Sequence, residues 1–229
     1  MLDINNTLDL IKLKFYNEWL YTSHLYDEGE SEFHKQITHD MVEKYVEPLN
    51  LNKDSNILDI GCGCGYFLDE MKEREFTNVT GITLSEGNAN QIKSRGLSAK
   101  VYDPTFLPQS HGFTDESVDF IFLRHTLHHS PYPIFSLTEY NRLLRQFGKM
   151  YIEVPAPENE RKLEYNNNHY SIFGATQLDA LLTRTGFKIE QFNNIGFDLK
   201  VNNTEGEETT VRENYYCILV TKQRPLDIK

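Results

Sequence analysis

Short apolar runs alternate with amphipathic segments along most of the chain. The first such run, residues 57–60, reads Ile-Leu-Asp-Ile, and residues 66–71 continue with a helical pattern. Further apolar runs occupy residues 78–83, 99–102, 117–123 and 147–155, with helical patterns after the first and third of these. Strands buried on both faces of a parallel sheet are nearly continuous in apolar residues. The pattern therefore predicts an α/β fold around a largely parallel sheet.

The two ends of the chain depart from this alternation. Residues 8–26 and 32–46 carry apolar side chains three and four apart, which predicts two helices, the second ending near Pro48. Thr176 to Asp179 predicts a capping box that opens a helix, and Gly186 stops that helix. Residues 187–192 and 215–220 predict a closing antiparallel pair, joined by a mobile acidic connection at residues 202–212. We expect a helical extension at residues 1–50 and one α/β domain at residues 51–229.

Three glycines follow the first predicted strand of the α/β domain: Gly61, Gly63 and Gly65. A strand, a glycine turn and a helix let a backbone pass close to a nucleotide-sized ligand. A side chain at Gly61 or Gly63 would occupy the space that the ligand needs. The alternative is a tight turn without a ligand, but three alternating glycines favour the binding interpretation.

The stretch from Asp59 to Gly65, Asp-Ile-Gly-Cys-Gly-Cys-Gly, resembles motif I of the class I S-adenosylmethionine (SAM) dependent methyltransferases. That motif is an acidic residue, one further residue and then G-x-G-x-G. The third glycine comes one residue earlier than in the dinucleotide fingerprint G-x-G-x-x-G. The resemblance implies SAM as cofactor. It also implies a Rossmann-like seven-stranded mixed sheet in the order 3-2-1-4-5-7-6, with the last strand antiparallel and helices on its faces.

The resemblance further implies which residues hold the cofactor. Asp59 matches the acid that binds the methionine end, and Asp103 matches the acid that accepts the adenine amine, although a turn role before Pro104 is the alternative. Thr83 stands where most members place an acid for the ribose, within a Gly-Ile-Thr-Leu-Ser run similar to that of cyclopropane fatty acid synthases. The full expected set is Asp59, Gly61, Cys62, Gly63, Thr83, Leu84, Asp103 and Arg124.

A histidine-rich segment, Arg-His-Thr-Leu-His-His at residues 124–129, follows the fourth predicted strand. The run from Arg124 to Pro157 resembles a methyltransferase subgroup with R-H-x-L-E-H and E-V-P-x-P elements, but this chain has His128 in place of the glutamate. Ligands of open α/β sheets lie beyond the carboxyl ends of strands, so the segment is expected to face the site. A role as hydrogen-bonded cap or loop residues is favoured for His125 and His128.

The expected catalytic residues are His129, His169 and Glu153. Histidine accepts protons near neutral pH, so the two histidines are candidates for a general base or for orienting the substrate. Glu153, at the end of the fifth strand, is expected to orient a histidine or to pair with a cationic acceptor. The same three residues offer metal ligands, but nothing in their spacing demands a metal, and Cys62-x-Cys64 lacks a second Cys/His pair. The sequence therefore predicts no metal site.

Composition narrows the classes of partner and compartment. The chain has 229 residues and a formal net charge of −11, which argues against a general nucleic-acid surface. No apolar stretch is long enough to span a bilayer, and the first residues do not resemble a signal peptide. The three cysteines predict reduced thiols and a cytoplasmic protein. The sequence leaves the oligomeric state open.

Three functions fit these observations. The first is SAM-dependent methyl transfer to an oxygen, nitrogen or carbon atom of a small-molecule acceptor. The second is methyl transfer to a protein, lipid or nucleic-acid acceptor, with nucleic acid disfavoured by the acidic balance and lipid left open by the Gly81 to Ser85 run. The third is a SAM-binding regulatory or scaffold protein without methyl transfer, which the departures at Thr83 and His128 keep open.

Overall fold

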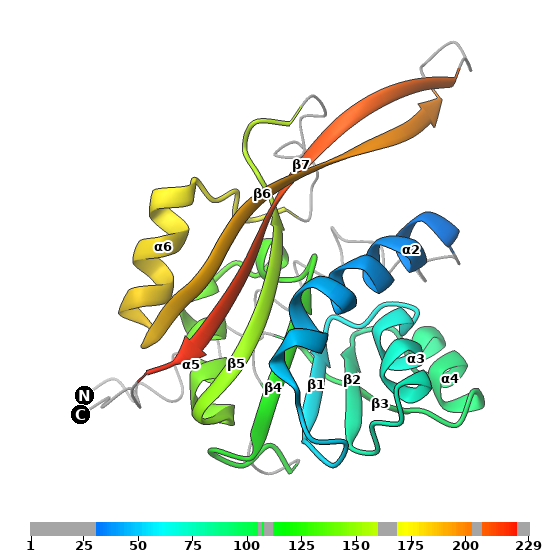
Figure 1. Cartoon of the computed structure of the whole chain (residues 1–229), viewed down its shortest axis with the longest axis vertical. Coiled ribbons are helices and arrows are strands. Elements are labelled where there is room, and N and C mark those ends of the chain that lie inside the picture. The colour runs from blue at the N-terminus through cyan, green and yellow to red at the C-terminus, as the bar shows by residue number, and fades with distance from the viewer. Residues whose placement is uncertain (1–30, 105–106, 108–111, 160–168, 203–207, 224–229) are drawn as a thin grey trace, which may run out of the picture.

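A seven-stranded sheet forms the centre of the protein in the computed structural model, which describes residues 31–104, 107, 112–159, 169–202 and 208–223. The strands are β1 (Ile57–Ile60), β2 (Val79–Thr83), β3 (Ser98–Val101), β4 (Val118–Arg124), β5 (Leu144–Pro155), β6 (Phe187–Asn202) and β7 (Glu208–Lys222). Their order is β3-β2-β1-β4-β5-β7-β6 (Figure 1). The first five strands in this order are parallel to one another, and β7 runs antiparallel to both β5 and β6. The predicted order and the antiparallel last strand are confirmed.

The described helices cover both faces of the sheet. They are α2 (Glu32–Met41), α3 (Tyr66–Glu73), α4 (Glu86–Ser94), α5 (Pro133–Leu143) and α6 (Ala175–Arg184), with short turns η1 (Val42–Val46), η2 (Glu47–Leu49) and η4 (Leu127–His129). Apolar residues of α2, η1 and α3 share one core with β1, β4, β5 and β7, while α5 and α6 pack on the other core. None of the described helices is long and apolar enough to cross a membrane.

The helical pattern of residues 32–46 continues into the core. Ser31 caps α2 by accepting a hydrogen bond from the backbone N–H of His34, and Tyr45 at the other end packs against Tyr151 of β5 with ring centroids 4.8 Å apart. Residues 32–46 therefore bury their apolar face on the sheet itself, and the division at residue 50 stays a prediction. The predicted helix at residues 8–26 lies outside the described residues.

The hairpin of β6 and β7 is longer than the sequence predicts and extends beyond the sheet as an arm (Figure 1). The expected mobile connection is wrong for residues 208–212, which pair with β6 from Asn202↔Glu208 to Asp198↔Arg212. Cross-strand charges explain the pairing, because Arg212 Nη1 lies 2.9 Å from Asp198 Oδ1 and Lys200 Nζ 2.8 Å from Glu208 Oε1.

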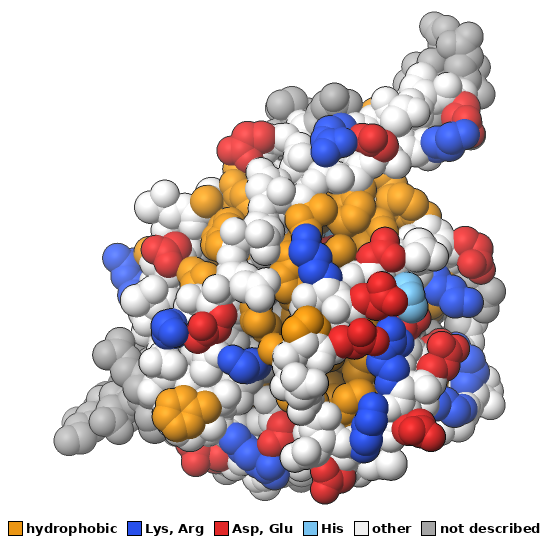
Figure 2. Space-filling model, in the orientation of Figure 1, with side chains coloured by type: hydrophobic (Ala, Val, Ile, Leu, Met, Phe, Trp, Pro, Cys, Tyr) orange, Lys and Arg blue, Asp and Glu red, His pale blue; other side chains and the backbone are white. Residues whose placement is uncertain are grey.

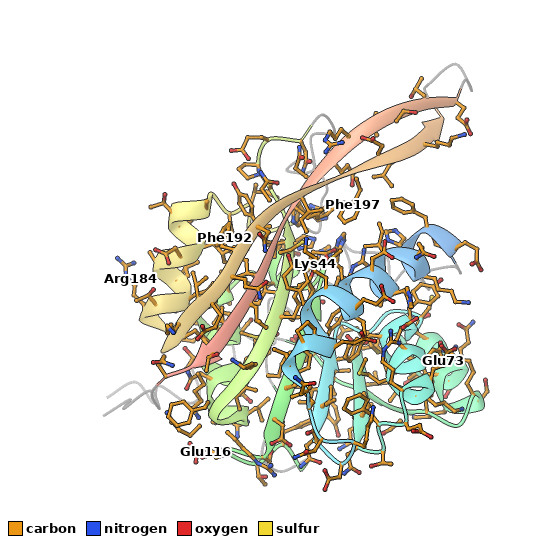
Figure 3. All side chains as sticks on the ribbon, viewed as in Figure 1. Lys44, Glu73, Glu116, Arg184, Phe192 and Phe197 are labelled. Carbon is orange, nitrogen blue, oxygen red and sulfur yellow. The ribbon has the colours of Figure 1, made fainter. Side chains whose placement is uncertain are left out.

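Near the base of the arm, apolar side chains face α2. Ile195 and Phe197 of β6 pack against the core that α2 and η1 share with the sheet. Figure 3 labels Phe197 on this side of the arm, and Figure 2 shows apolar side chains gathered between the arm and α2. The arm and α2 are thus anchored to the same apolar layer.

The start of α6 differs from the prediction. The N-cap residue is Gly174, which has no side chain to offer, and Thr176 lies inside the first turn of the helix. The predicted capping box is therefore wrong, because the helix begins before Thr176. The predicted stop is confirmed, since Gly186 follows the C-cap residue Thr185 with φ of +86°, a conformation that glycine adopts without strain.

Candidate active site

The glycine turn between β1 and α3 forms one wall of a cavity at the carboxyl end of β1. Gly61, Gly63 and Gly65 all have positive φ, and the backbone N–H groups of Gly61 and Cys62 both donate to the carbonyl of Ile82 on β2. Five of the expected cofactor residues line the cavity, together with side chains from α2, α3 and β4: Asp59, Gly61, Cys62, Gly63 and Arg124. The turn and the buried Asp59 therefore share one cavity, and their role at the methionine end of SAM stays a prediction.

Gly61 is required by packing within the chain. With φ of +80°, a Cβ atom at this position would lie 1.9 Å from Oγ1 of Thr126, in the segment that follows β4. Thr126 in turn donates a hydrogen bond from Oγ1 to the carbonyl of Ile60 at 2.9 Å. The expectation that a ligand excludes a side chain at Gly61 is therefore incomplete, because the nearest obstacle belongs to the protein. Sequence spacing could not reveal it, since the two residues lie 65 positions apart.

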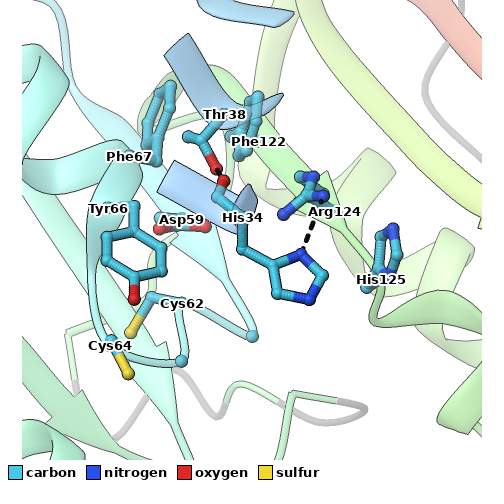
Figure 4. A pocket seen from close by; sticks show the side chains of 12 residues that line it. His34, Thr38, Asp59, Cys62, Cys64, Tyr66, Phe67, Phe122, Arg124 and His125 are labelled. Atoms are coloured by element: carbon cyan, nitrogen blue, oxygen red, sulfur yellow. Dashed lines mark hydrogen bonds between the residues drawn. The ribbon is translucent and has the colours of Figure 1, made fainter. Parts of the chain in front are cut away.

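Helix α2 lies over the glycine turn. The hydroxyl of Tyr66, the first residue of α3, accepts a hydrogen bond from the backbone N–H of Ser31 at 2.5 Å. His34 and Thr38 of α2 line the cavity, and Nη2 of Arg124 lies 3.5 Å from Nδ1 of His34 (Figure 4). The helical extension therefore contributes side chains to the cavity. The sequence analysis did not single out His34, Thr38 or Tyr66, although the capped start of α2 at Ser31 was a detectable signal.

The remaining expected cofactor residues lie along the same edge of the sheet but are not among the residues that line this cavity. Thr83 ends β2, where its Oγ1 accepts a hydrogen bond from Ser85 N at 3.1 Å and its carbonyl accepts one from Tyr102 N. Thr83 pairs in register with Val101 of β3, which places Asp103 just beyond the end of the neighbouring strand. Leu84 follows Thr83 directly. The expected roles of Thr83, Leu84 and Asp103 at the ribose and adenine stay predictions.

Glu153 is completely buried and fully engaged by its neighbours. Its Oε1 accepts hydrogen bonds from Nε of Arg124 at 2.8 Å and from Nε2 of His125 at 2.7 Å, and its Oε2 accepts one from the hydroxyl of Tyr151 at 2.6 Å. We call these four residues the Glu153 network. Burial raises the pKa of Glu153, but Arg124 and the hydrogen bonds outweigh it and lower the pKa to about 2. Glu153 is therefore an ionised group that orients Arg124 and His125.

His125 is held in an unusual backbone conformation by this network. Its φ is +53°, its backbone N–H donates to the carbonyl of Glu153, and its ring stacks on Tyr215 with centroids 4.6 Å apart. A positive φ at a residue other than glycine is strained and persists only where neighbours fix it. The network therefore places the imidazole of His125 at the cavity wall.

The other expected catalytic residues lie together, apart from Glu153. The backbone N–H of Ser171 donates to the carbonyl of His128, which brings His169 beside η4. The rings of His128, His129 and His169 have centroids 4.1 to 4.9 Å apart. We call these three residues the histidine cluster. It adjoins the cavity, because the ring of His128 lies 6.1 Å from the ring of His125.

His128 is buried, contrary to its neighbours in the cluster, which are half-buried. Burial and the neighbouring histidines His129, His169 and His125 all hold the pKa of His128 well below its usual value. Its imidazole is therefore neutral near pH 7. The sequence analysis favoured a cap or loop role for His128, and the structure places it in η4 between the cavity and the two expected catalytic histidines.

The sheet order and the glycine turn define a nucleotide-binding α/β protein. The sequence model of the methyltransferase-domain family matches residues 31–209. The chain therefore belongs to the family of SAM-dependent methyltransferases, and SAM is its cofactor. The glycine turn and the buried carboxylate of Asp59 suit the methionine end of that cofactor.

Individual relatives differ in what their names say they act on. The chain is 25% identical over 185 residues to the 27-O-demethylrifamycin SV methyltransferase of Amycolatopsis mediterranei, covering 75% of this chain and 68% of the relative. It is 29% identical over 173 residues to the tRNA U34 carboxymethyltransferase of Aliarcobacter butzleri, covering 70% of this chain and 55% of that relative. Among solved structures, the YcgJ protein of Bacillus subtilis is 16% identical with a TM-score of 0.64, covering 81% of this chain and 99% of that one. The last likeness shows the fold.

Proposed function

We propose that the chain transfers the methyl group of SAM to an oxygen, nitrogen or carbon atom of a small-molecule acceptor. The observation that supports this most directly is the histidine cluster beside the cavity at the carboxyl end of β4. Ligands of open α/β sheets occupy this edge, and the cofactor residues take up the part next to the glycine turn. The acceptor then lies toward η4 and the segment at His169.

Bound SAM supplies an electrophilic methyl group on a sulfonium sulfur. For a hydroxyl acceptor, the oxygen forms the new bond to the methyl carbon while the bond from carbon to sulfur breaks, and S-adenosylhomocysteine leaves. The hydroxyl proton passes to a neutral imidazole, and we assign His129 and His169 to orienting the acceptor and receiving that proton. Holding the acceptor in line with the methyl group contributes up to about 7 to 11 kcal/mol.

In this proposal Asp59 binds the ammonium of the methionine moiety, and Glu153 acts only through its neighbours. A carboxylate that already accepts from four donors cannot also pair with a cationic acceptor without breaking its network. Thr83, Leu84 and Asp103 serve the ribose and adenine end. Arg124, held by Glu153 and facing the cavity, suits the cofactor carboxylate as a charge-assisted donor.

The charge of the chain favours a small molecule over tRNA. Proteins that bind nucleic acid neutralise phosphates with clustered lysines and arginines, whereas this chain has a formal net charge of −11. The carboxymethyltransferase relative acts on tRNA by its name, so the assay must include tRNA.

The test is a transfer assay with tritiated SAM against four acceptor pools, namely a small-molecule extract, a lipid extract, total protein and total tRNA. We expect label in the small-molecule pool. Asp59→Asn should abolish both SAM binding in calorimetry and transfer, while Asp54→Asn, in the exposed turn before β1, should leave both unchanged. Label found only in tRNA, lipid or protein would overturn the acceptor class, and tight SAM binding without label in any pool would favour a regulatory or scaffold protein.

A further inference from the structure

Three imidazole side chains converge in the histidine cluster. One ligand atom from each of His128, His129 and His169 lies within 4.8 Å of the others, and His128 is buried while the other two are half-buried. The rings meet at angles of 39°, 83° and 75°, so they are not stacked as three parallel plates. One ring nitrogen from each residue therefore lies close to the other two.

The cluster includes a buried ring nitrogen that makes no hydrogen bond within the described part of the chain. Nδ1 of the buried His128 has no hydrogen-bond partner among the residues that the structure describes. A buried polar atom without a partner is destabilising by about 1 to 3 kcal/mol, so such atoms usually bind water, an ion or a ligand.

We propose that His128, His129 and His169 bind a divalent transition-metal ion, with Zn²⁺ as the best match. Three imidazole ligands suit Zn²⁺ better than Mg²⁺ or Ca²⁺, which prefer oxygen ligands. Nitrogens around a tetrahedral Zn²⁺ lie about 3.3 Å apart, given bonds of about 2.0 Å. The side chains therefore need to close by about 1.5 Å at most from their 4.8 Å limit.

Three protein ligands would leave the fourth position of a tetrahedral Zn²⁺ to water or to a reacting molecule. This is the pattern of zinc sites that bind a reacting molecule, whereas structural sites have four protein ligands. The carboxylate of Glu153 is not part of the site, because it is occupied by its own network. The sequence analysis predicted no metal because of the spacing of the residues. That spacing could not show that His128 lies beside His129 and His169.

The metal site adds to the proposed function. It rests on that function only for the claim that the methyl acceptor is the molecule that binds the metal. With Zn²⁺ bound, the cation polarises an acceptor oxygen directly, and the proton goes to solvent instead of to an imidazole. Metal binding itself can be measured without any acceptor. Its failure would leave methyl transfer intact and would return His129 and His169 to direct contact with the acceptor.

The experiment uses the full chain without an affinity tag, stripped with a chelator and titrated with ZnCl₂ in calorimetry. We expect one equivalent of Zn²⁺ per chain. Co²⁺ in place of Zn²⁺ should give the visible absorption bands of a tetrahedral site. Bound Zn²⁺ should also raise the melting temperature, since a ligand that binds only the native state stabilises it.

Variants locate the site. His129→Ala and His169→Ala should each weaken Zn²⁺ binding by about 100-fold or more and remove the Co²⁺ bands. Both residues are half-buried, so these variants should fold even if His128→Ala does not. The matched control is His39→Ala, a histidine of α2 that pairs with Glu43 and Glu70, and its Zn²⁺ affinity should not change. No Zn²⁺ binding by the wild type, or equal binding by wild type and both cluster variants, would overturn the proposal.

Discussion

Glu153 and His128 are both buried polar side chains at the same edge of the sheet, but their surroundings are opposite. Glu153 accepts hydrogen bonds from the side chains of Arg124, His125, Tyr151 and Cys217 and remains charged, with a pKa lowered to about 2. His128 is neutral, with its pKa held low by burial first, and its Nδ1 has no hydrogen-bond partner among the described residues. The hydrogen bonds of Glu153 are complete, whereas His128 lies in a cluster that can bind a further ligand.

This difference distinguishes a residue that orients other side chains from residues that take part in the reaction. A saturated carboxylate in a dry site cannot take up a proton or a ligand until a neighbour leaves, so the Glu153 network sets the geometry of Arg124 and His125. Imidazoles that are half-buried can accept a proton or bind a cation without disrupting the fold. Perturbed pKa values occur in both regions, so a perturbed pKa alone would not tell them apart.

The largest effect should come from breaking the Glu153 network. Glu153→Ala leaves the guanidinium of Arg124 largely buried without its carboxylate, and removal of one partner from a buried ion pair destabilises by about 3 to 5 kcal/mol. Urea unfolding at pH 7 measures this loss. Glu208→Ala, which removes an exposed pair on the arm, should change stability by less than about 1 kcal/mol. An equal effect of the two substitutions would contradict the structural role.

The same network predicts a dependence on pH with a definite sign. The folded-state pKa of Glu153 is about 2, below the ordinary value of 4.5, so the unfolded chain binds the proton more readily. The stabilisation is complete above about pH 4.5 and is lost as the pH falls toward 2. Unfolding measured from pH 6 to 3 should show this loss in the wild type and a smaller loss in Glu153→Gln. Identical slopes for the two proteins would exclude Glu153 as the titrating group.

The histidine cluster should give the opposite result, with lost activity and retained stability. His169→Ala should lower the transfer rate by about 10²-fold, since it removes either a proton acceptor or a ligand of the cation. Its half-buried ring contributes little to the core, so the midpoint of urea unfolding should stay close to that of the wild type. Initial rates at saturating SAM, compared with those of His39→Ala, provide the measurement. Unchanged rates would remove the cluster from the mechanism.

A substitution at Gly61 should have a smaller effect and tests how tightly the glycine turn packs against Thr126. Gly61→Ala places a methyl group against Thr126 at a backbone angle that favours glycine, so we expect a loss of about 1 to 3 kcal/mol in unfolding free energy. Thr126→Ala removes Oγ1 and Cγ2, the two atoms nearest to the added methyl group. The double variant should therefore be more stable than the sum of the two single changes predicts. Strict additivity would show that the backbone angle alone is responsible.

Local patterns in the sequence were sufficient for the sheet and for the glycine turn. Continuous apolar runs mark the parallel strands, and the family resemblance supplied their order, which does not follow from periodicity. Contacts between distant residues were not predictable in the same way. The collision between Gly61 and Thr126, the saturation of Glu153 and the entry of His128 into the cluster each depend on segments brought together only by the fold.

The predictions failed for a related reason at residues 208–212 and at Thr176. The acidic composition of residues 202–212 indicated a mobile loop, but Glu208 pairs with Lys200 of β6 and Arg212 pairs with Asp198 of β6. Threonine often caps a helix, but α6 already begins at Ala175, so Thr176 lies inside the helix. Composition describes a residue by itself, while pairing and helix boundaries depend on neighbours that only the structure provides.

The smallest expected effect concerns the contact between α2 and the Glu153 network. Nδ1 of His34 lies 3.5 Å from Nη2 of Arg124, which is at the long limit for a hydrogen bond and is exposed. Since Glu153 already fixes Arg124, His34→Ala should weaken SAM binding by less than about 10-fold, equivalent to about 1.4 kcal/mol, without changing the unfolding midpoint. Calorimetry with SAM measures the change, and Lys35→Ala, on the exposed side of the same helix turn, is the control. A loss above about 100-fold would mean that α2 holds the cofactor directly and that the Glu153 network does not set the cavity wall alone.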